Sequence, residues 1–96
     1  MSTLLDGFDK AFENKVRLGA MAALMVNEAL DFQRLKELLQ VTDGNLATHL
    51  RTLEEKKYVT YEKAFSGRKP RTLYRATKKC QLAFKRHLKA IEDLLN

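Results

Sequence analysis

The chain of 96 residues contains a single cysteine, Cys80, a single proline, Pro70, and no tryptophan. One cysteine excludes an intrachain disulfide bond, which fits the reducing environment of the cytosol. The N-terminal residues show no signal-peptide pattern, and no apolar run is long enough to cross a bilayer. We therefore expect a cytoplasmic protein with no membrane partner.

Motifs for catalysis and for cofactor binding are also missing. The four glycines form no phosphate-binding loop, no nucleophile is paired with a base, and no ligand spacing suits a metal. Cys80 and His87 share a face of the expected last helix, but two helical turns separate them by about 10.5 Å, too far for one zinc ion. We predict no enzyme activity, cofactor or metal. Cys80 is interpreted as a buried structural residue, with a sensing role or a metal site across two subunits as the alternatives.

Positive charge is abundant and unevenly distributed. The formal net charge is +6 and the isoelectric point is near 9.6. Between residues 58 and 89 there are ten lysines and arginines and a single acidic residue, Glu62, whereas residues 1–57 carry eight basic and nine acidic side chains. A basic half of this kind favours a polyanionic partner, although a merely soluble basic protein is the alternative.

The spacing of apolar residues predicts an α+β fold that is mainly helical, in a single domain covering residues 1–96. We expect a short leading helix (4–12), a nearly apolar buried helix (15–26), a short strand (29–32), a brief helix (33–39), a polar helix (43–56), two strands (58–65 and 72–76) around a turn (66–71), and a long final helix (77–95). Asn14, Thr42 and Thr77 are the expected N-caps of three of these helices.

The polar helix at 43–56 has two distinct faces. Three leucines at i, i+4 and i+7 are expected to face the core, and the opposite side carries small hydrogen-bonding residues that suit the edges of base pairs. A glycine in the first turn allows close approach of the backbone to a ligand. The candidate DNA-binding residues here are Thr42, Gly44, Asn45, Thr48, His49 and Thr52. The alternative interpretation is a solvated polar face.

The expected hairpin tip concentrates three cations, Arg68, Lys69 and Arg71. Gly67 permits unusual backbone dihedral angles in the turn, and Pro70 stiffens it. A protruding basic loop can lie along a phosphate backbone or insert an arginine into a narrow minor groove. We therefore predict that the tip binds DNA, with a loop made soluble by its charge as the alternative.

Four stretches together closely resemble the short winged-helix transcriptional regulators related to the MarR and ArsR groups. They are VTDGNLATHL at 41–50, LEEKKYV at 53–59, GRKPRT at 67–72 and YRAT at 74–77. The resemblance implies a winged helix-turn-helix with a two- to three-stranded antiparallel wing sheet and a long C-terminal helix. It also implies a recognition helix at 42–56, a supporting helix at 33–39, a wing tip at 66–72, and a homodimer on a pseudo-palindromic operator. Cys80 departs from the pattern, because such proteins often carry glycine there.

The two ends of the chain carry more apolar surface than one small domain should need. We expect the leading helix (1–13) and the final helix (77–96) to form a dimer interface, although all of this surface could instead pack within one chain. The predicted interface residues are Leu5, Phe8, Phe12, Phe84, Leu88, Ile91 and Leu95.

These features together predict a homodimeric regulator that binds double-stranded DNA by sequence, with repression favoured over activation. A winged-helix module for protein–protein contacts and an RNA-binding winged helix are the rival hypotheses. The sequence specifies neither the operator nor a small-molecule effector.

Overall fold

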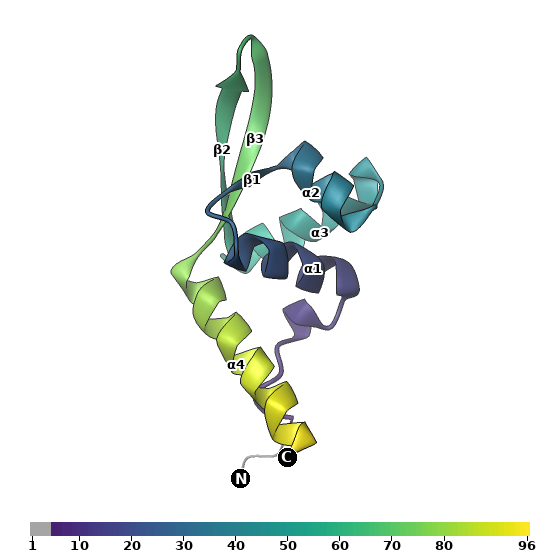
Figure 1. Ribbon diagram of the computed structural model, residues 1–96, viewed down its shortest axis with the longest axis vertical. Coiled ribbons are helices and arrows are strands. Elements are labelled where there is room, and N and C mark those ends of the chain that lie inside the picture. The colour runs from purple at the N-terminus through teal and green to yellow at the C-terminus, as the bar shows by residue number, and fades with distance from the viewer. Residues whose placement is uncertain (1–4) are drawn as a thin grey trace.

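Five helical segments and three strands make up residues 5–96, the part of the chain that the computed structural model describes (Figure 1). The helical segments are the 3-10 helix η1 (Lys10–Phe12) and the α-helices α1 (Lys15–Met25), α2 (Phe32–Leu39), α3 (Asp43–Glu55) and α4 (Lys78–Leu95). The strands are β1 (Leu30–Asp31), β2 (Val59–Ser66) and β3 (Lys69–Ala76). From α1 onward, the predicted order of elements is confirmed.

Each α-helix begins at a side chain that accepts hydrogen bonds from the free N–H groups of its first turn. The capping residues of α1, α2, α3 and α4 are Asn14, Asp31, Thr42 and Thr77. The predicted caps Asn14, Thr42 and Thr77 are confirmed. Such a side chain stabilises a helix start by roughly 1 kcal/mol and fixes where the helix begins.

The sheet is antiparallel and has the strand order β1-β3-β2. β2 and β3 pair from Val59 opposite Ala76 to Ser66 opposite Lys69. Gly67 has a φ of 65°, which allows a two-residue turn and lets the pairing continue almost to the tip. The predicted turn at 66–71 is therefore too long, because Lys69, Pro70 and Arg71 belong to β3.

The hydrophobic core lies where α1, α2, α3, the sheet and the start of α4 meet. The three leucines of α3 are buried as predicted, and residues from every other α-helix and from all three strands pack against them. The most deeply buried large side chains are Met21, Leu35, Leu46, Leu50, Leu53 and Cys80. This core holds α3 against the domain, so that only one side of the helix faces solvent.

The predicted leading helix is wrong for the residues that the structure describes; Leu4 lies outside them. Residues 5–7 form a turn, and only Lys10–Phe12 is helical, as the single 3-10 segment η1. A Cβ atom on Gly7 would lie 3.0 Å from the Cβ of Ala90, so the backbone here lies directly against α4. The side chain of Asp9 then caps η1 by accepting from the N–H of Ala11 at 2.9 Å.

Two predicted interface residues, Phe12 and Phe84, belong to the core of the chain instead. Their exposed fractions are only 2% and 7%, and their ring centroids lie 5.3 Å apart. Phe12 also stacks on Tyr58 and contacts His87, a buried residue whose Nδ1 accepts from the N–H of Asp9 at 3.0 Å. The leading segment is thus fixed to α4 by its own aromatic cluster, which leaves neither phenylalanine available to a partner.

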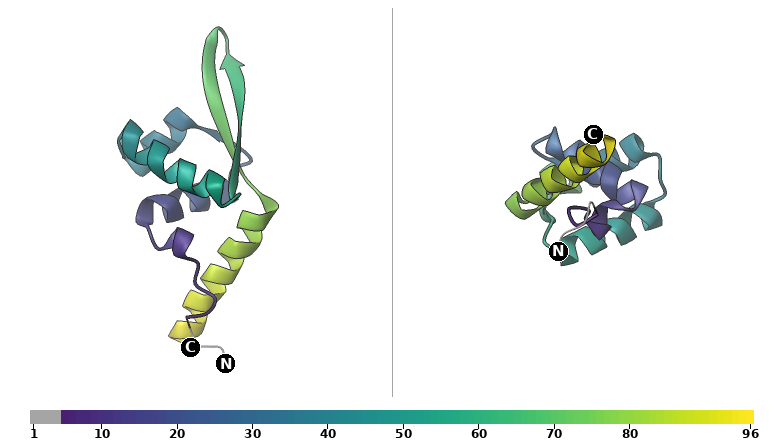
Figure 2. Two further views of the ribbon diagram at one scale, coloured as in Figure 1. Left: turned by 180° about the vertical axis from the view of Figure 1, so that it is seen from behind. Right: turned by 90° about the horizontal axis from the view of Figure 1, so that it is seen from below.

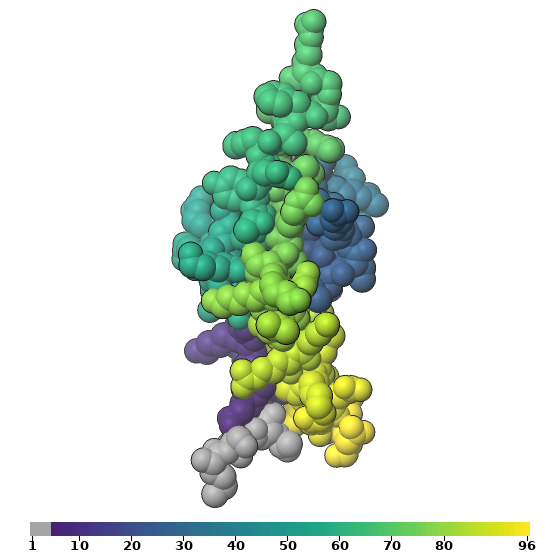
Figure 3. All heavy atoms as spheres, turned by 90° about the vertical axis from the view of Figure 1, so that its left-hand side faces the viewer, coloured from purple at the N-terminus to yellow at the C-terminus, as the bar shows by residue number. Residues whose placement is uncertain are grey.

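The molecule is elongated, with extents of 54 × 24 × 22 Å. The hairpin of β2 and β3 extends from one end and α4 runs toward the other, as the view from behind shows (Figure 2, left). The space-filling view shows the hairpin tip standing clear of the helices (Figure 3). The hairpin tip is therefore at one end of the protein and the C-terminus is at the other, with α3 between them (Figure 1).

Candidate nucleic-acid interface

The exposed side of α3 presents most of the predicted binding residues. Thr42, Gly44, Asn45 and Thr48 are exposed, whereas His49 and Thr52 are partly buried. A Cβ atom on Gly44 would meet nothing within 4 Å, so the glycine leaves an open surface above the first turn. The structure places these residues on one side of the helix as predicted.

The hydroxyl groups of two threonines are already used inside α3. The hydroxyl of Thr48 donates to the carbonyl oxygen of Gly44 at 2.9 Å, and that of Thr52 donates to the carbonyl oxygen of Thr48 at 3.3 Å. A hydroxyl has one hydrogen and two acceptor lone pairs. In this arrangement Thr48 and Thr52 offer a ligand an acceptor and a methyl group, whereas the amide of Asn45 can still both donate and accept.

Asp43, the acidic residue in the first turn of α3, has its own cationic partner. Its carboxylate lies 2.8 Å from Nζ of Lys36 on α2. The pair links the two helices and offsets the negative charge that would otherwise face an anionic ligand at this helix start. The carboxylate remains 72% exposed, so the stability gained is small.

His49 contacts Arg17 of α1, a pairing that the sequence did not reveal. Nη1 of Arg17 lies 3.1 Å from Nδ1 of His49, and Nε of Arg17 donates to the carbonyl oxygen of Ala11 at 2.8 Å. Burial, followed by the nearby guanidinium charge, lowers the pKa of His49 below its usual value. The imidazole is therefore neutral at pH 7.

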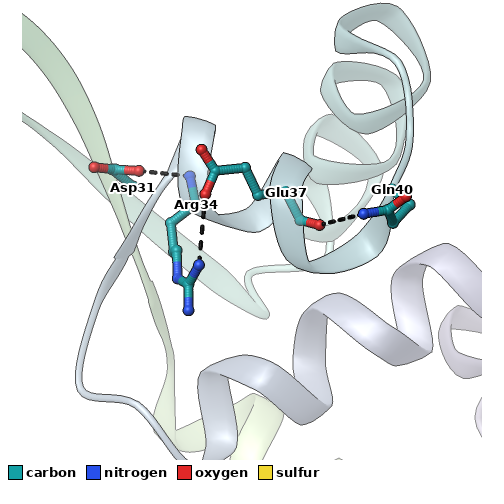
Figure 4. A network of polar contacts seen from close by, with 4 residues as sticks. All are labelled: Asp31, Arg34, Glu37 and Gln40. Carbon is teal, nitrogen blue, oxygen red and sulfur yellow. Dashed lines mark hydrogen bonds and ion pairs between the residues drawn. The ribbon is translucent and has the colours of Figure 1, made fainter.

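The wing cations differ in whether they are paired. Arg71 lies 3.3 Å from Oδ2 of Asp31, the residue that caps α2 by accepting from the N–H of Arg34 at 2.7 Å (Figure 4). In contrast, Arg68 and Lys69 are exposed and have no ion pair with any residue in the described range 5–96. The tip therefore carries two free cations, and Arg71 fixes the hairpin to the start of α2.

Two further exposed residues lie beside this surface. Arg51 is exposed on α3, three residues after Thr48, so it lies on the same side of the helix. Phe65 is 71% exposed near the wing tip and lies opposite Pro70. The three-residue spacing from Thr48 could have identified Arg51 from the sequence.

The single cysteine is inaccessible. Cys80 has no exposed surface, and its Sγ lies 3.0 Å from Sδ of Met21. Burial, with a contribution from the charge of Asp9, raises the pKa of the thiol to about 11. A buried, protonated thiol is unreactive, which favours the structural interpretation over a redox sensor.

Neither a metal site nor a membrane-spanning helix is present in the described part of the chain. Over residues 5–96, no three His, Cys, Asp or Glu side chains come together as a metal site would need. The helices of that range are also too short or too polar to cross a membrane.

The remaining predicted interface residues lie around α4 and the leading segment. Leu88, Ile91 and Leu95 are 46%, 37% and 82% exposed, and Leu5 is 64% exposed. Phe8 is partly buried, with its ring 5.2 Å from that of His87. Phe12 and Phe84 are buried in the core, but Leu88, Ile91 and Leu95 remain exposed and form an apolar strip along the surface of α4.

The chain is similar in sequence and in structure to known proteins. The profile of the family described as "Winged helix DNA-binding domain" matches residues 16–95. An uncharacterized protein of Methanocaldococcus jannaschii is 38% identical over 85 residues, which are 88% of this chain and 92% of that protein. A transcriptional regulator homologue from Pyrococcus horikoshii has a similar structure, with a TM-score of 0.84 and 29% identity over 96% of this chain and 89% of that one.

Other solved structures share the fold. The transcriptional repressor CouR, solved on a 23-mer DNA duplex, has a TM-score of 0.73 and 19% identity over 95% of this chain and 71% of that one. Further neighbours are MarR-family regulators. With a capped helix α3, a three-stranded sheet and a basic hairpin, and with the family profile matching residues 16–95, the chain belongs to the winged helix DNA-binding domain family.

Proposed function

We propose that the chain is a single-domain, homodimeric repressor that binds double-stranded DNA by sequence. The observation that carries the proposal is the pairing of two features: Asn45 and Thr48 face solvent on α3, and Arg68 and Lys69 at the hairpin tip have no ion pair within residues 5–96. Base edges are read by residues of this type in the major groove, and phosphate contacts supply affinity without sequence information.

The proposed roles of α3 and of the hairpin tip follow from the chemistry of their side chains. Asn45 can form a bidentate pair with adenine, and Thr48 and Thr52 can contact a thymine methyl group. Arg68 and Lys69 supply phosphate or minor-groove contacts. Arg71 uses Nη1 for Asp31, so its other N–H donors can bind a phosphate while the pair with Asp31 holds the side chain beside the start of α2.

Dimerisation would place two copies of α3 on one duplex. The exposed apolar strip on α4, with Leu88, Ile91 and Leu95, supports a symmetric contact between two chains, since an isolated domain rarely exposes a continuous row of this kind. CouR, a repressor with the same fold, binds a DNA duplex. We extend that activity to this chain as repression by occupancy of an operator.

Selection of bound duplexes from a random pool with the purified protein tests the proposal. A palindromic consensus is expected, with half-sites separated by a whole number of helical turns. Competition between duplex DNA and single-stranded RNA separates this function from RNA binding. The absence of any salt-sensitive binding to duplex DNA would instead support a protein–protein module.

Replacing Lys69 with glutamine should weaken binding to all sequences alike. Removal of one phosphate contact lowers the slope of log affinity against log salt by about 0.9, while the consensus stays the same. Titrations at several salt concentrations measure this change. The matched control is Lys85→Gln on α4, an exposed lysine, which should leave the slope unaltered; equal effects of the two changes would refute a role for the wing tip.

Replacing Gly44 with alanine should weaken DNA binding without harming the fold. The new methyl group meets no atom of the protein within 4 Å, and alanine favours a helix by about 0.5–1 kcal/mol over glycine. The midpoint of thermal unfolding should therefore stay constant or rise, while the affinity for the selected operator falls. Unchanged affinity would show that the backbone at Gly44 does not approach the DNA.

A further inference from the structure

Arg17, at the start of α1, contacts both the nearby segment η1 and His49 of α3, which is 32 residues away in the sequence. Its Nε donates to the carbonyl oxygen of Ala11 in η1, at 2.8 Å, and its Nη1 lies 3.1 Å from Nδ1 of His49 in α3. Arg17 is itself held at the start of α1, where its N–H donates to the side chain of Asn14 at 3.1 Å. The backbone of Arg17 is therefore held by Asn14, and its guanidinium group is held by Ala11 and His49.

The chemistry of this contact determines which nitrogen of His49 carries the proton. A guanidinium group has only donors, so the imidazole nitrogen facing it must accept. Nδ1 of His49 is then unprotonated, and in the neutral ring the hydrogen is on Nε2. Protonation of both nitrogens would place a donor against a donor and two cations in contact, and burial with the Arg17 charge already lowers the pKa of His49.

We propose that Arg17 is a positioning residue that holds His49 as a neutral imidazole whose Nε2–H donates to an acceptor on bound duplex DNA. The proposal rests on the DNA-binding function proposed above. His49 follows Asn45 by one helical turn, so both are on one side of α3, and His49 is partly exposed. The acceptor is a base-edge atom or a phosphate oxygen, which have the same hydrogen-bonding chemistry toward an N–H.

This arrangement assigns Arg17 a task different from that of the wing cations. Both of its directed contacts are within the protein, and each uses a different nitrogen of the guanidinium group. A lysine at this position keeps the charge but has a single side-chain nitrogen. It therefore cannot replace both the Nε contact with Ala11 and the Nη1 contact with His49 in their present geometry. Arg17→Lys and Arg17→Gln therefore separate the loss of geometry from the loss of charge.

The protonation state can be tested on the free protein. Long-range proton–nitrogen NMR correlations of the histidine rings report the tautomer, and His49→Gln assigns the signals by removing one set. His87, whose Nδ1 accepts from the N–H of Asp9, is the internal reference. We expect the Nε2–H tautomer for both rings, with the titration midpoint of His49 rising in Arg17→Gln. A His49 ring protonated at Nδ1, or one unaffected by Arg17→Gln, would overturn the assignment.

The DNA contact is tested with the same variants on the selected operator. His49→Gln and Arg17→Gln should each weaken binding by about fivefold, the effect of one lost hydrogen bond, and the double variant should be little weaker than either. Lys15→Gln, which removes a neighbouring cation from α1, is the matched control for charge. Additive losses in the double variant, or an equal loss in Lys15→Gln, would contradict the positioning role.

The pattern of loss across sequences identifies the acceptor. A loss in His49→Gln confined to operators with one particular base pair indicates a base edge, and an equal loss on all duplexes indicates a phosphate; both support the proposal. Arg17→Lys keeps the positive charge, so it reports on the lost geometry at His49 even if Arg17→Gln fails to fold. If the wild-type protein binds no duplex, the proposed function fails, while the NMR result still decides the Arg17–His49 assignment.

Discussion

Replacing Leu88 and Ile91 together with lysine is expected to separate the proposed dimer into monomers that bind the operator 100- to 10,000-fold more weakly. The two side chains are 46% and 37% exposed in the apolar strip of α4, and placing cations there would oppose contact between two chains. The second half-site would then no longer bind as part of the same molecule, and linked binding of this kind contributes affinity in roughly that range. Sedimentation measures the mass, and titration with one and two half-sites measures the affinity.

Leu82→Lys provides the matched control on the same helix. Leu82 is 60% exposed, but it precedes Leu88 by six residues, which places it about a third of a turn around α4. This variant should remain dimeric and bind normally. A wild-type protein that sediments as a monomer, or a double variant that stays dimeric, would show that the apolar strip serves another purpose.

Replacing Asn45 with alanine is expected to remove much of the discrimination between the operator and random DNA. The lost bidentate contact to a base contributes about 1–3 kcal/mol to discrimination, which is roughly a five- to 150-fold loss. The salt dependence should stay the same, because no phosphate contact is removed. Titration against the selected operator and against versions mutated at each base pair measures both quantities.

The control for this variant is Asn27→Ala, which deletes the same amide at an exposed position after α1. The side chain of Asn27 donates to the carbonyl oxygen of Ala23 at 2.8 Å, so its loss affects only the end of α1. Retention of full discrimination by the Asn45 variant would exclude Asn45 from base reading and favour Arg51, which is exposed on the same side of α3.

Local signals in the sequence were sufficient to place most of the fold. A capping side chain followed by apolar residues with helical spacing identified the starts of α1, α3 and α4, because the groups that decide a helix start lie within three residues of one another. The same reasoning wrongly predicted a helix in the leading segment. Its apolar residues had helical spacing, but the contact of Gly7 with Ala90 depends on residues more than eighty positions apart, and no local pattern contains it.

In the candidate site, too, the sequence did not reveal contacts between residues on separate elements. The sequence correctly identified the exposed side of α3 and the cations of the hairpin, because each set lies on one element with a known periodicity. It could not show that Arg71 is paired with Asp31 or that Arg17 faces His49, because those pairs form only when separate elements pack. Periodicity likewise showed that Phe12 and Phe84 are on apolar faces, without showing whether such a face packs inside one chain or against another.

The register of the hairpin has a consequence for how the protein behaves at high concentration. Ser66 and Lys69 close the two-residue turn, so Phe65 and Pro70 form the next pair, at which backbone N–H groups point away from the partner strand. Pro70 has no N–H to offer at that outer edge. An approaching strand from another molecule therefore finds one hydrogen-bond donor missing, with Arg71 following next along the same edge. The β3 side of the protruding hairpin is in this way disfavoured for strand addition, which otherwise leads exposed edges to aggregate.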